Sequence, residues 1–333
     1  MVNLKTKYLG LEIKNPLVAS ASSISKKIEN IIKLEDVGIG SIVLYSLFEE
    51  ELIHETLAMD YYLTRGSDSF AEALTYFPEL DNYNSGPDKY LELITKAKER
   101  VSIPIIASLN GISGGDWTKY AKMIEQAGAD ALELNIYFIP TDLDLVSSKI
   151  ENSYIDLVRD VSKEILIPLS VKLSPYFSSL PNLANNLIKA GAEGLVLFNR
   201  FYQPDLNIED LTVEPTLELS TPSDLLLPMR WTAILYKNIQ ADIAVSSGVH
   251  SGKDIIKAMM AGASVAMTAS ELINNGIASI KTMLLELSNW MESHEYESVN
   301  SLRGILSQSS TVNPAAFERA NYMKALTLFD NKI

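Results

Sequence analysis

The sequence predicts a (β/α)8 TIM barrel, and three observations support the prediction. Eight short apolar runs recur along the chain, and their continuous apolar character is typical of parallel strands covered on both faces. Helical patterns that stop at a glycine separate most of the runs, as in KYAKMIEQAGAD and LANNLIKAGAEG. Polar residues end the runs, and such barrels have their chemistry at strand ends. Eight strand and helix units suit a closed barrel better than an open sheet.

The expected strands follow one another in chain order. They are NPLVASA (15–21), SIVLYS (41–46), PIIASLN (104–110), ALELNI (131–136), PLSVKL (168–173), GLVLFN (194–199), DIAVSS (242–247) and SVAMTA (264–269). Residues 277–324 are expected to form several helices that close the barrel or extend beyond it. The amphipathic run NPAAFERANYMKALTLF near the end is expected to pack on the core.

Two connections are longer than a barrel requires. The first, about residues 47–90 after the second strand, is rich in aromatic and turn residues and predicts a lid or pocket wall. The second, about residues 200–229 after the sixth strand, contains the alternating LTVEPTLELS, which predicts an accessory hairpin or strand pair. Both inserts leave from the face that carries the strand ends. A subunit contact would explain either insert equally well.

Length and composition favour a single domain over residues 1–333. Hydrophobic residues make up 47% of the chain, enough to bury a large core, and no sharp linker interrupts it. The opening MVNLKTKYLGLEIKN has no apolar stretch long enough for a signal peptide or a membrane span, so we expect a cytoplasmic protein. The absence of cysteine removes disulfides, iron–sulfur clusters and thiolate chemistry.

The charge of the chain argues against several kinds of partner. A formal net charge of −14 opposes binding to nucleic acid or to an anionic membrane surface, because both need clustered Lys and Arg. The three histidines, His54, His250 and His294, are scattered without metal-ligand spacing, so we expect no metal site. A small-molecule substrate is the remaining expectation.

Polar residues at the strand ends form the candidate site. Parallel strands bring their carboxyl ends to one face of a barrel, so these side chains are expected to meet there. The polar residues are Asn110, Asn135, Lys172, Asn199, Ser247 and Thr268, and the small residues Gly248 and Ala269 follow the last two. Any one of them could instead cap a helix or a turn. Lys172 is the most informative member, because a lysine in a buried strand is costly to desolvate unless Glu or Asp pairs with it.

The motifs together resemble a known family. In order they are NPLVASAS, an ELN strand end, VKLSPYF, an FN strand end, SSGVHSGKD and AGASVAMTAS, and they resemble the flavin-dependent dihydroorotate dehydrogenases over about residues 11–272. The resemblance implies FMN bound non-covalently at the C-terminal face of the barrel. Small residues and backbone N–H groups suit a phosphate, and the loops after strands seven and eight commonly supply them. Ser247, Gly248, Thr268 and Ala269 lie in those loops.

The same resemblance assigns the other flavin contacts. Lys172 is expected to place a positive charge near N1 and the C2 oxygen of the flavin, where it stabilises the reduced form. Amide side chains both donate and accept hydrogen bonds, which suits contact with flavin or substrate. The segment beside the flavin, the hydroxyl beside its ring and the amides are Ala19, Ser20, Ala21, Ser46, Asn110, Asn135 and Asn199.

Four departures from the family lie mostly on the substrate side. The family has a Ser-Cys or Ser-Ser pair after ELN, and the second member removes a proton from dihydroorotate; Tyr137 and Phe138 stand there in this chain. Tyr45 replaces a flavin-contacting lysine, and Met267 replaces a glycine before Thr268. The asparagine-rich substrate loop is also changed, to ALTYFPELDN. Losing a general base typically lowers the rate by roughly 10²- to 10⁴-fold.

We therefore expect an FMN-dependent oxidoreductase that acts on a CH–CH bond and resembles dihydroorotate dehydrogenase, the pyrimidine-biosynthesis enzyme, but lacks its Cys or Ser base, which leaves open whether the substrate is dihydroorotate or another compound. A phenol has a reference pKa of about 10, so Tyr137 favours proton donation during reduction of an activated C=C bond. Two alternatives remain open: an FMN-binding relative without catalysis, and a flavin-free barrel in which Lys172 forms a Schiff base. The resemblance also implies a homodimer.

Overall fold

The computed structural model describes residues 2–48, 86–111, 117–136, 138–200, 203–214 and 216–330. Its central feature is a closed barrel of eight parallel strands in the order β11-β12-β3-β4-β5-β6-β7-β8, which confirms the predicted fold. The strands are β3 (Leu17–Ala19), β4 (Ser41–Phe48), β5 (Ile105–Asn110), β6 (Ala131–Asn135), β7 (Leu169–Leu173), β8 (Gly194–Leu197), β11 (Asp242–Ser246) and β12 (Val265–Thr268). Each lies within or overlaps one of the eight apolar runs.

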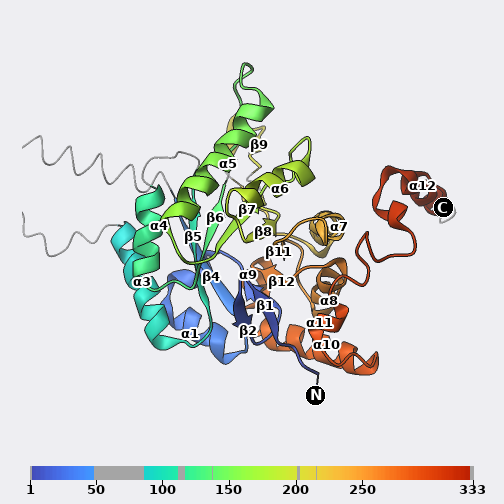
Figure 1. The fold of residues 1–333 in the computed structure, drawn as a ribbon, viewed down its shortest axis with the longest axis horizontal. Coiled ribbons are helices and arrows are strands. Elements are labelled where there is room, and N and C mark those ends of the chain that lie inside the picture. Colours follow the sequence, from blue (N-terminus) through green and yellow to red (C-terminus); the bar gives the residue numbers. More distant parts are fainter. Residues whose placement is uncertain are drawn as a thin grey trace, which may run out of the picture.

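Helices surround the barrel, as Figure 1 shows. Each strand leads into one that covers its outer face: α1 (Ile28–Asp36), α3 (Gly86–Arg100), α4 (Trp117–Gln126), α5 (Ser147–Glu164), α6 (Leu180–Lys189), α7 (Leu226–Leu235), α8 (Gly252–Ala261) and α10 (Ser279–Ser293). The cause is helical amphipathicity: α6 buries Leu180, Leu183, Ala184 and Leu187, which share one face at helical spacing. After α6 the chain turns at Gly191, whose φ of +118° suits glycine.

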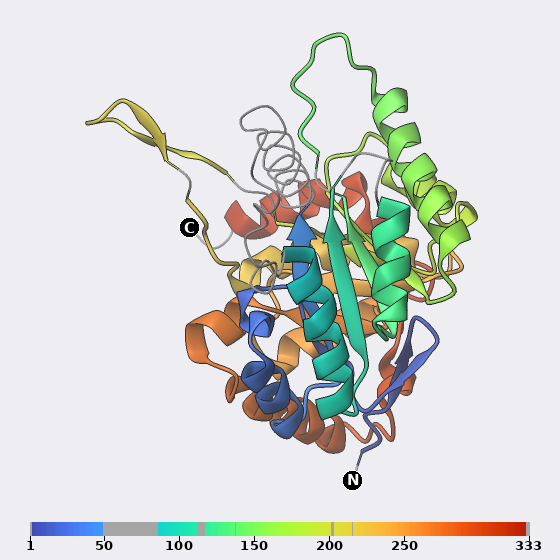
Figure 2. The same cartoon turned by 90° about the vertical axis from the view of Figure 1, so that its left-hand side faces the viewer.

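The barrel interior is apolar at the N-terminal ends of the strands. A separate inner cluster fills this end, and it comprises Tyr8, Leu9, Ile13, Val18, Val43, Ile106, Ala131, Val196, Ala244, Val265 and Met267. The hairpin of β1 (Thr6–Tyr8) and β2 (Leu11–Ile13) contributes to this cluster and lies at the same end as the N-terminus (Figure 2). Sequence reasoning did not anticipate this hairpin, although YLGLE contains its turn at Leu9 and Gly10, both with positive φ.

Asp242 fastens this end of the barrel. Its carboxylate accepts hydrogen bonds from the Leu9 backbone N–H at 2.8 Å and from Ser264 Oγ at 2.5 Å. The Arg303 guanidinium lies 3.2 Å from the same carboxylate and also bonds Ser264. One side chain at the start of β11 thus joins the N-terminal hairpin, the start of β12 and the C-terminal region.

The two long inserts give different outcomes. Residues 49–85 of the first lie outside the described residues, so the predicted lid remains a prediction. In the second, β9 (Asp205–Asn207) and β10 (Thr212–Glu214) form the predicted hairpin, which projects from the barrel in Figure 2. Its first strand lies upstream of LTVEPTLELS, and residues 216–220 form no strand.

The C-terminal region corrects one expectation. After α10 the chain forms α11 (Val299–Leu302), η4 (Pro314–Phe317), η5 (Arg319–Asn321) and α12 (Tyr322–Asp330). The expected core packing of the last segment is wrong for α12, where Tyr322 and Met323 are 64% and 70% exposed. Helices α10 and α11 already pack on α8, and α12 stands apart from the barrel in Figure 1. Among the helices that the described residues form, none has the length and apolar character needed to cross a membrane.

Candidate active site

The barrel interior becomes polar toward the C-terminal ends of the strands. Strand register aligns two rows of side chains across β4 to β7, and alternation along a strand puts both rows on the side that faces inward. The row nearer the strand ends is Phe48, Asn110, Asn135 and Lys172. The row beneath it is Ser46, Ser108, Glu133 and Ser170. The structure therefore brings together amides and a lysine that are far apart in the sequence.

Lys172 has a buried partner that sequence reasoning left unidentified. Its Nζ lies 3.6 Å from Glu133 Oε1 and donates a hydrogen bond to Ser20 Oγ at 3.3 Å. The Lys172 side chain is 7% exposed and that of Glu133 is fully buried. The carboxylate compensates the ammonium, so the lysine has a structural explanation as well as a functional one. Because an ammonium has three N–H donors, these two long contacts leave capacity for a ligand.

The strand-end amides contact one another. Asn199 Nδ2 donates a hydrogen bond of 2.6 Å to Asn135 Oδ1, which joins the end of β6 to the residues that follow β8. The Asn199 backbone N–H is fixed by Leu173 O at 2.7 Å. Asn110, the register neighbour of Asn135, is buried at the end of β5. Amides held in this way present fixed donors and acceptors to a ligand placed above the barrel.

The remaining small residues take distinct places. Ser20 accepts the Lys172 hydrogen bond, and its backbone N–H bonds Thr268 O at 2.9 Å. Ala19 packs in the outer core between strands and helices, whereas Ala21 packs against the inner cluster. Ser46 lies in the lower row, and its hydroxyl is 2.8 Å from that of Ser108. A ligand at the strand ends would thus meet Ser20 before Ser46.

The loops after β11 and β12 have constrained backbones. Ser247 has a φ of +78°, which costs energy for a non-glycine residue and is typical of ligand sites. Gly248 has a φ of +75°, and a Cβ there would lie 2.1 Å from the backbone N of Leu225. Its N–H donates to Ser220 Oγ at 3.3 Å. Thr268 Oγ1 donates to Val249 O at 2.8 Å, and Ala269 precedes the short helix α9 (Ser270–Asn275).

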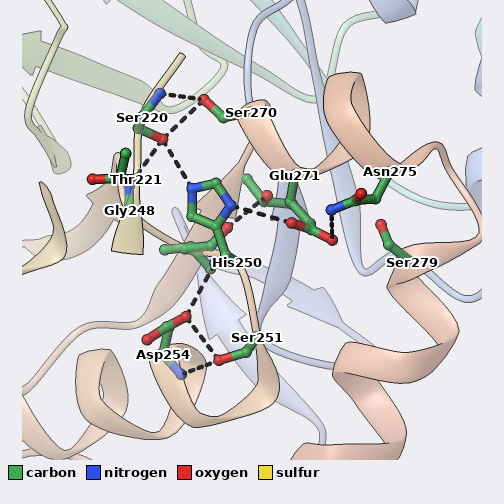
Figure 3. Close-up of polar contacts among 12 residues, drawn as sticks. Ser220, Thr221, Gly248, His250, Ser251, Asp254, Ser270, Glu271, Asn275 and Ser279 are labelled. Carbon is green, nitrogen blue, oxygen red and sulfur yellow. Dashed lines mark hydrogen bonds and ion pairs between the residues drawn. The ribbon is translucent and has the colours of Figure 1, made fainter. Parts of the chain in front are cut away.

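A polar network supports these loops (Figure 3). His250 Nε2 lies 3.3 Å from Ser220 Oγ, and its Nδ1 lies 3.1 Å from Glu271 Oε2. Ser270 Oγ accepts hydrogen bonds of 2.9 Å from both the backbone N–H and the hydroxyl of Ser220. Sequence reasoning judged His250 only by metal-ligand spacing and missed this role, because its partners come from segments well separated in sequence.

A cavity of about 580 Å³ opens beside the ends of β7, β8 and β11. Asn199, Ser246, Ser247, Tyr176, Arg200 and Asp224 are among its lining residues, whereas Lys172 is not. Arg200 Nη1 pairs with Asp224 Oδ2 at 3.0 Å. Burial alone would raise the pKa of the Asp224 carboxyl, but hydrogen bonds from Thr221 and the charge of Arg200 outweigh it and lower that pKa. The cavity wall therefore has its own internal charge pair.

The family departures have structural correlates. Tyr137 and the ALTYFPELDN segment lie outside the described residues. Phe138, the residue that the resemblance aligns with the family base, packs against the outer core. Tyr45 packs edge-on to Tyr90 with ring centroids 5.0 Å apart, and Lys26 Nζ lies 5.0 Å from the Tyr45 centroid. Met267 fills the inner cluster.

Comparison with known proteins identifies similar chains. A family model described as dihydroorotate dehydrogenase matches residues 80–291. The catalytic subunit of dihydroorotate dehydrogenase B (NAD(+)) from Thermoplasma volcanium is 25% identical over 319 residues, covering 92% of this chain and 99% of the relative. The corresponding subunit from Methanocaldococcus jannaschii is 26% identical over 301 residues, or 87% and 94% of the two chains. A chloroplastic dihydropyrimidine dehydrogenase (NADP(+)) from Arabidopsis thaliana is 22% identical over 321 residues, or 89% and 75%.

Substituting Gly248→Ala should destabilise the protein more than Gly10→Ala. Both glycines have similar positive φ, +75° and +72°, so each substitution should cost about 1–2 kcal/mol of backbone strain. Only Gly248 also faces a backbone at 2.1 Å, whereas a Cβ at Gly10 meets nothing within 4 Å. That clash should add about 1–3 kcal/mol to the loss in unfolding free energy, measured by urea denaturation. Equal losses would show that the loop after β11 is not seated on Leu225.

Proposed function

Because the chain belongs to the dihydroorotate dehydrogenase family, we propose that it is an FMN-dependent oxidoreductase acting on a CH–CH bond. The observation that most strongly supports this proposal is the buried Lys172 ammonium beside Asn135 and Asn199 at the C-terminal ends of the strands. A cation and fixed amides at that place suit the pyrimidine edge of a flavin ring. A homodimer, which the family resemblance implies, belongs to the same proposal, and a cytoplasmic location is proposed with it.

The chemistry of the site residues fits FMN. Lys172 and Ser20 would hold the flavin ring at its N1 and C2 oxygen side, and Asn110, Asn135 and Asn199 would serve as amide partners for flavin or substrate. The cavity beside Asn199 and Ser247 offers room that continues toward the loops expected at the phosphate. The Gly248 N–H is held by Ser220 Oγ at a long 3.3 Å, a contact that a phosphate oxygen would compete for.

The substrate proposed here differs from dihydroorotate. Phe138 cannot accept a proton, and its ring packs against the outer core, which leaves oxidation of dihydroorotate without the family base. Reduction of an activated C=C bond needs a hydride, which bound FMN would supply after reduction by an electron carrier, and a proton at the neighbouring carbon. We assign that proton to the Tyr137 hydroxyl. The relative named for dihydropyrimidine is consistent with a ring substrate.

One observation favours a second candidate, a flavin-binding relative without catalysis. The resemblance aligns the family base with Phe138, whose apolar ring packs against the outer core. The Schiff-base alternative gains less support, because the Lys172 ammonium pairs with Glu133, and a nucleophilic amine must be uncharged. Photoreduction of the flavin without oxygen distinguishes the FMN-dependent enzyme from the relative without catalysis. The flavin of a protein without catalysis would be reoxidised only by oxygen.

The freshly purified protein should show the absorption bands of oxidised flavin, and the released chromophore should have the mass of FMN. This follows from the cation and amides at the strand ends. The measurement is a visible spectrum followed by mass spectrometry of the denatured supernatant. A colourless protein that takes up no added FMN would contradict the proposal; borohydride trapping of a carbonyl compound on Lys172 would then test the Schiff-base alternative.

Substituting Tyr137→Phe should leave the flavin bound and lower the turnover of an activated alkene by about 10²- to 10⁴-fold, because the proton donor is lost. The measurement is the rate at which alkene substrates, screened on the wild type, reoxidise the photoreduced protein without oxygen. Tyr322→Phe, which alters an exposed tyrosine of α12 away from the strand ends, is the control and should keep wild-type turnover within a few-fold. Unchanged turnover in Tyr137→Phe removes Tyr137 from the reaction.

A further inference from the structure

Glu133 is a buried carboxylate whose role the proposed reaction does not use. Its side chain is fully buried inside the barrel, and neither of its oxygens has a hydrogen-bond donor among the described residues. The single group of opposite charge recorded within ion-pair distance there is Lys172, 3.6 Å from Oε1. Buried carboxylates ordinarily accept several hydrogen bonds, so this one is held chiefly by a single cation.

The neighbours of Glu133 do not neutralise it. The hydroxyl of Ser46 lies against that of Ser108, and the hydroxyl of Ser170 donates to Leu132 O at 3.4 Å. Two buried phenols lie within reach of the charge of Glu133, Tyr8 from the N-terminal hairpin and Tyr90 from α3. Burial, and then the charge of Glu133, raise the pKa of Tyr8 well above its usual value; burial chiefly raises that of Tyr90, and the same charge adds to it. The negative charge of Glu133 therefore affects the pKa of groups on two different elements.

Stability alone gives a weak reason for this pair. Desolvating two charges offsets most of their mutual attraction, so a buried ion pair contributes little net stability compared with apolar side chains of similar volume. The position of the pair in the barrel suggests that it acts on a bound ligand. Glu133 lies one row beneath Asn135 and Lys172, and the ammonium separates it from the strand ends where a ligand would bind. In a region of low dielectric, that negative charge also reaches a ligand that touches Lys172.

We propose that Glu133 tunes the positive charge that Lys172 presents, and so keeps the reduction potential of the bound flavin low. Adding electrons to a flavin places negative charge on its ring beside Lys172. The carboxylate beneath opposes that added charge and makes the reduced state less stable than a lone lysine would. Glu133 acts through Lys172, so it is a positioning residue. The inference rests on the proposed function. A low reduction potential favours reduction of a C=C bond, because it makes the reduced flavin a better hydride donor.

Glu133→Gln tests the proposal in the FMN-loaded protein, because glutamine keeps the shape and removes the charge. The reduction potential is measured by equilibration with reference dyes without oxygen, under the same conditions for every variant. We expect at least a tenfold shift of the equilibrium toward reduced flavin, about 30 mV upward for a two-electron couple. Tyr8→Phe is the matched control: it removes a buried hydroxyl from the same region without changing charge, and should keep the wild-type potential.

Glu133→Met, an apolar side chain of similar length, guards against a folding defect of the first variant and should shift the potential in the same direction. Circular dichroism checks that each protein is folded. An unchanged or lower potential in a folded, flavin-bound Glu133 variant overturns the inference and leaves the proposed function standing. Loss of flavin from both Glu133 variants, while Tyr8→Phe keeps it, also overturns the inference, since Glu133 would then hold the site together. A wild type that binds no FMN overturns both proposals.

Discussion

The contact between the Lys172 ammonium and the Glu133 carboxylate constrains the rest of the barrel. Two charges 3.6 Å apart are tolerated inside a protein only where each compensates the desolvation of the other. The inner cluster under them supplies an apolar floor, and the outer core seals the strands against the helices. Only the C-terminal side is left for a polar ligand. The same constraint therefore fixes where the site lies and which charge it presents.

The residues that stabilise the barrel and those of the candidate site lie at opposite ends of the strands. At the N-terminal end, Asp242 ties the hairpin that contains Leu9 to Ser264 and Arg303. At the C-terminal end, the amides Asn135 and Asn199 are held in place by each other, and Ser247 adopts a backbone conformation that is costly for serine. A rigid base permits strain of this kind at the opposite end. Such a division is typical of barrel enzymes, in which the loops after the strands carry the function.

The sequence predicts the positions of the strands well, but it does not predict which side chains contact one another. Both faces of each strand are buried, so each strand is a continuous apolar run, and all eight can be recognised in the sequence. The sequence also contains the glutamate of ALELNI, but the register of β6 on β7 pairs Glu133 with Ser170, and only the folded structure shows the Lys172 ammonium 3.6 Å from its carboxylate. His250 was passed over because Ser220 and Glu271 meet it through tertiary packing. The exposed α12 shows a further limit, since an apolar helix needs an uncovered partner face and α8 is already covered.

A crystal structure of the protein grown with FMN would show whether Lys172 binds the flavin. We expect a flavin at the C-terminal ends of the strands, with Lys172 Nζ within hydrogen-bond distance of the N1 and C2 oxygen side of the ring and Glu133 still beneath it. A flavin bound elsewhere, with Lys172 contacting only Glu133 and Ser20, would show that the buried pair is a structural feature of the barrel and not part of a flavin site.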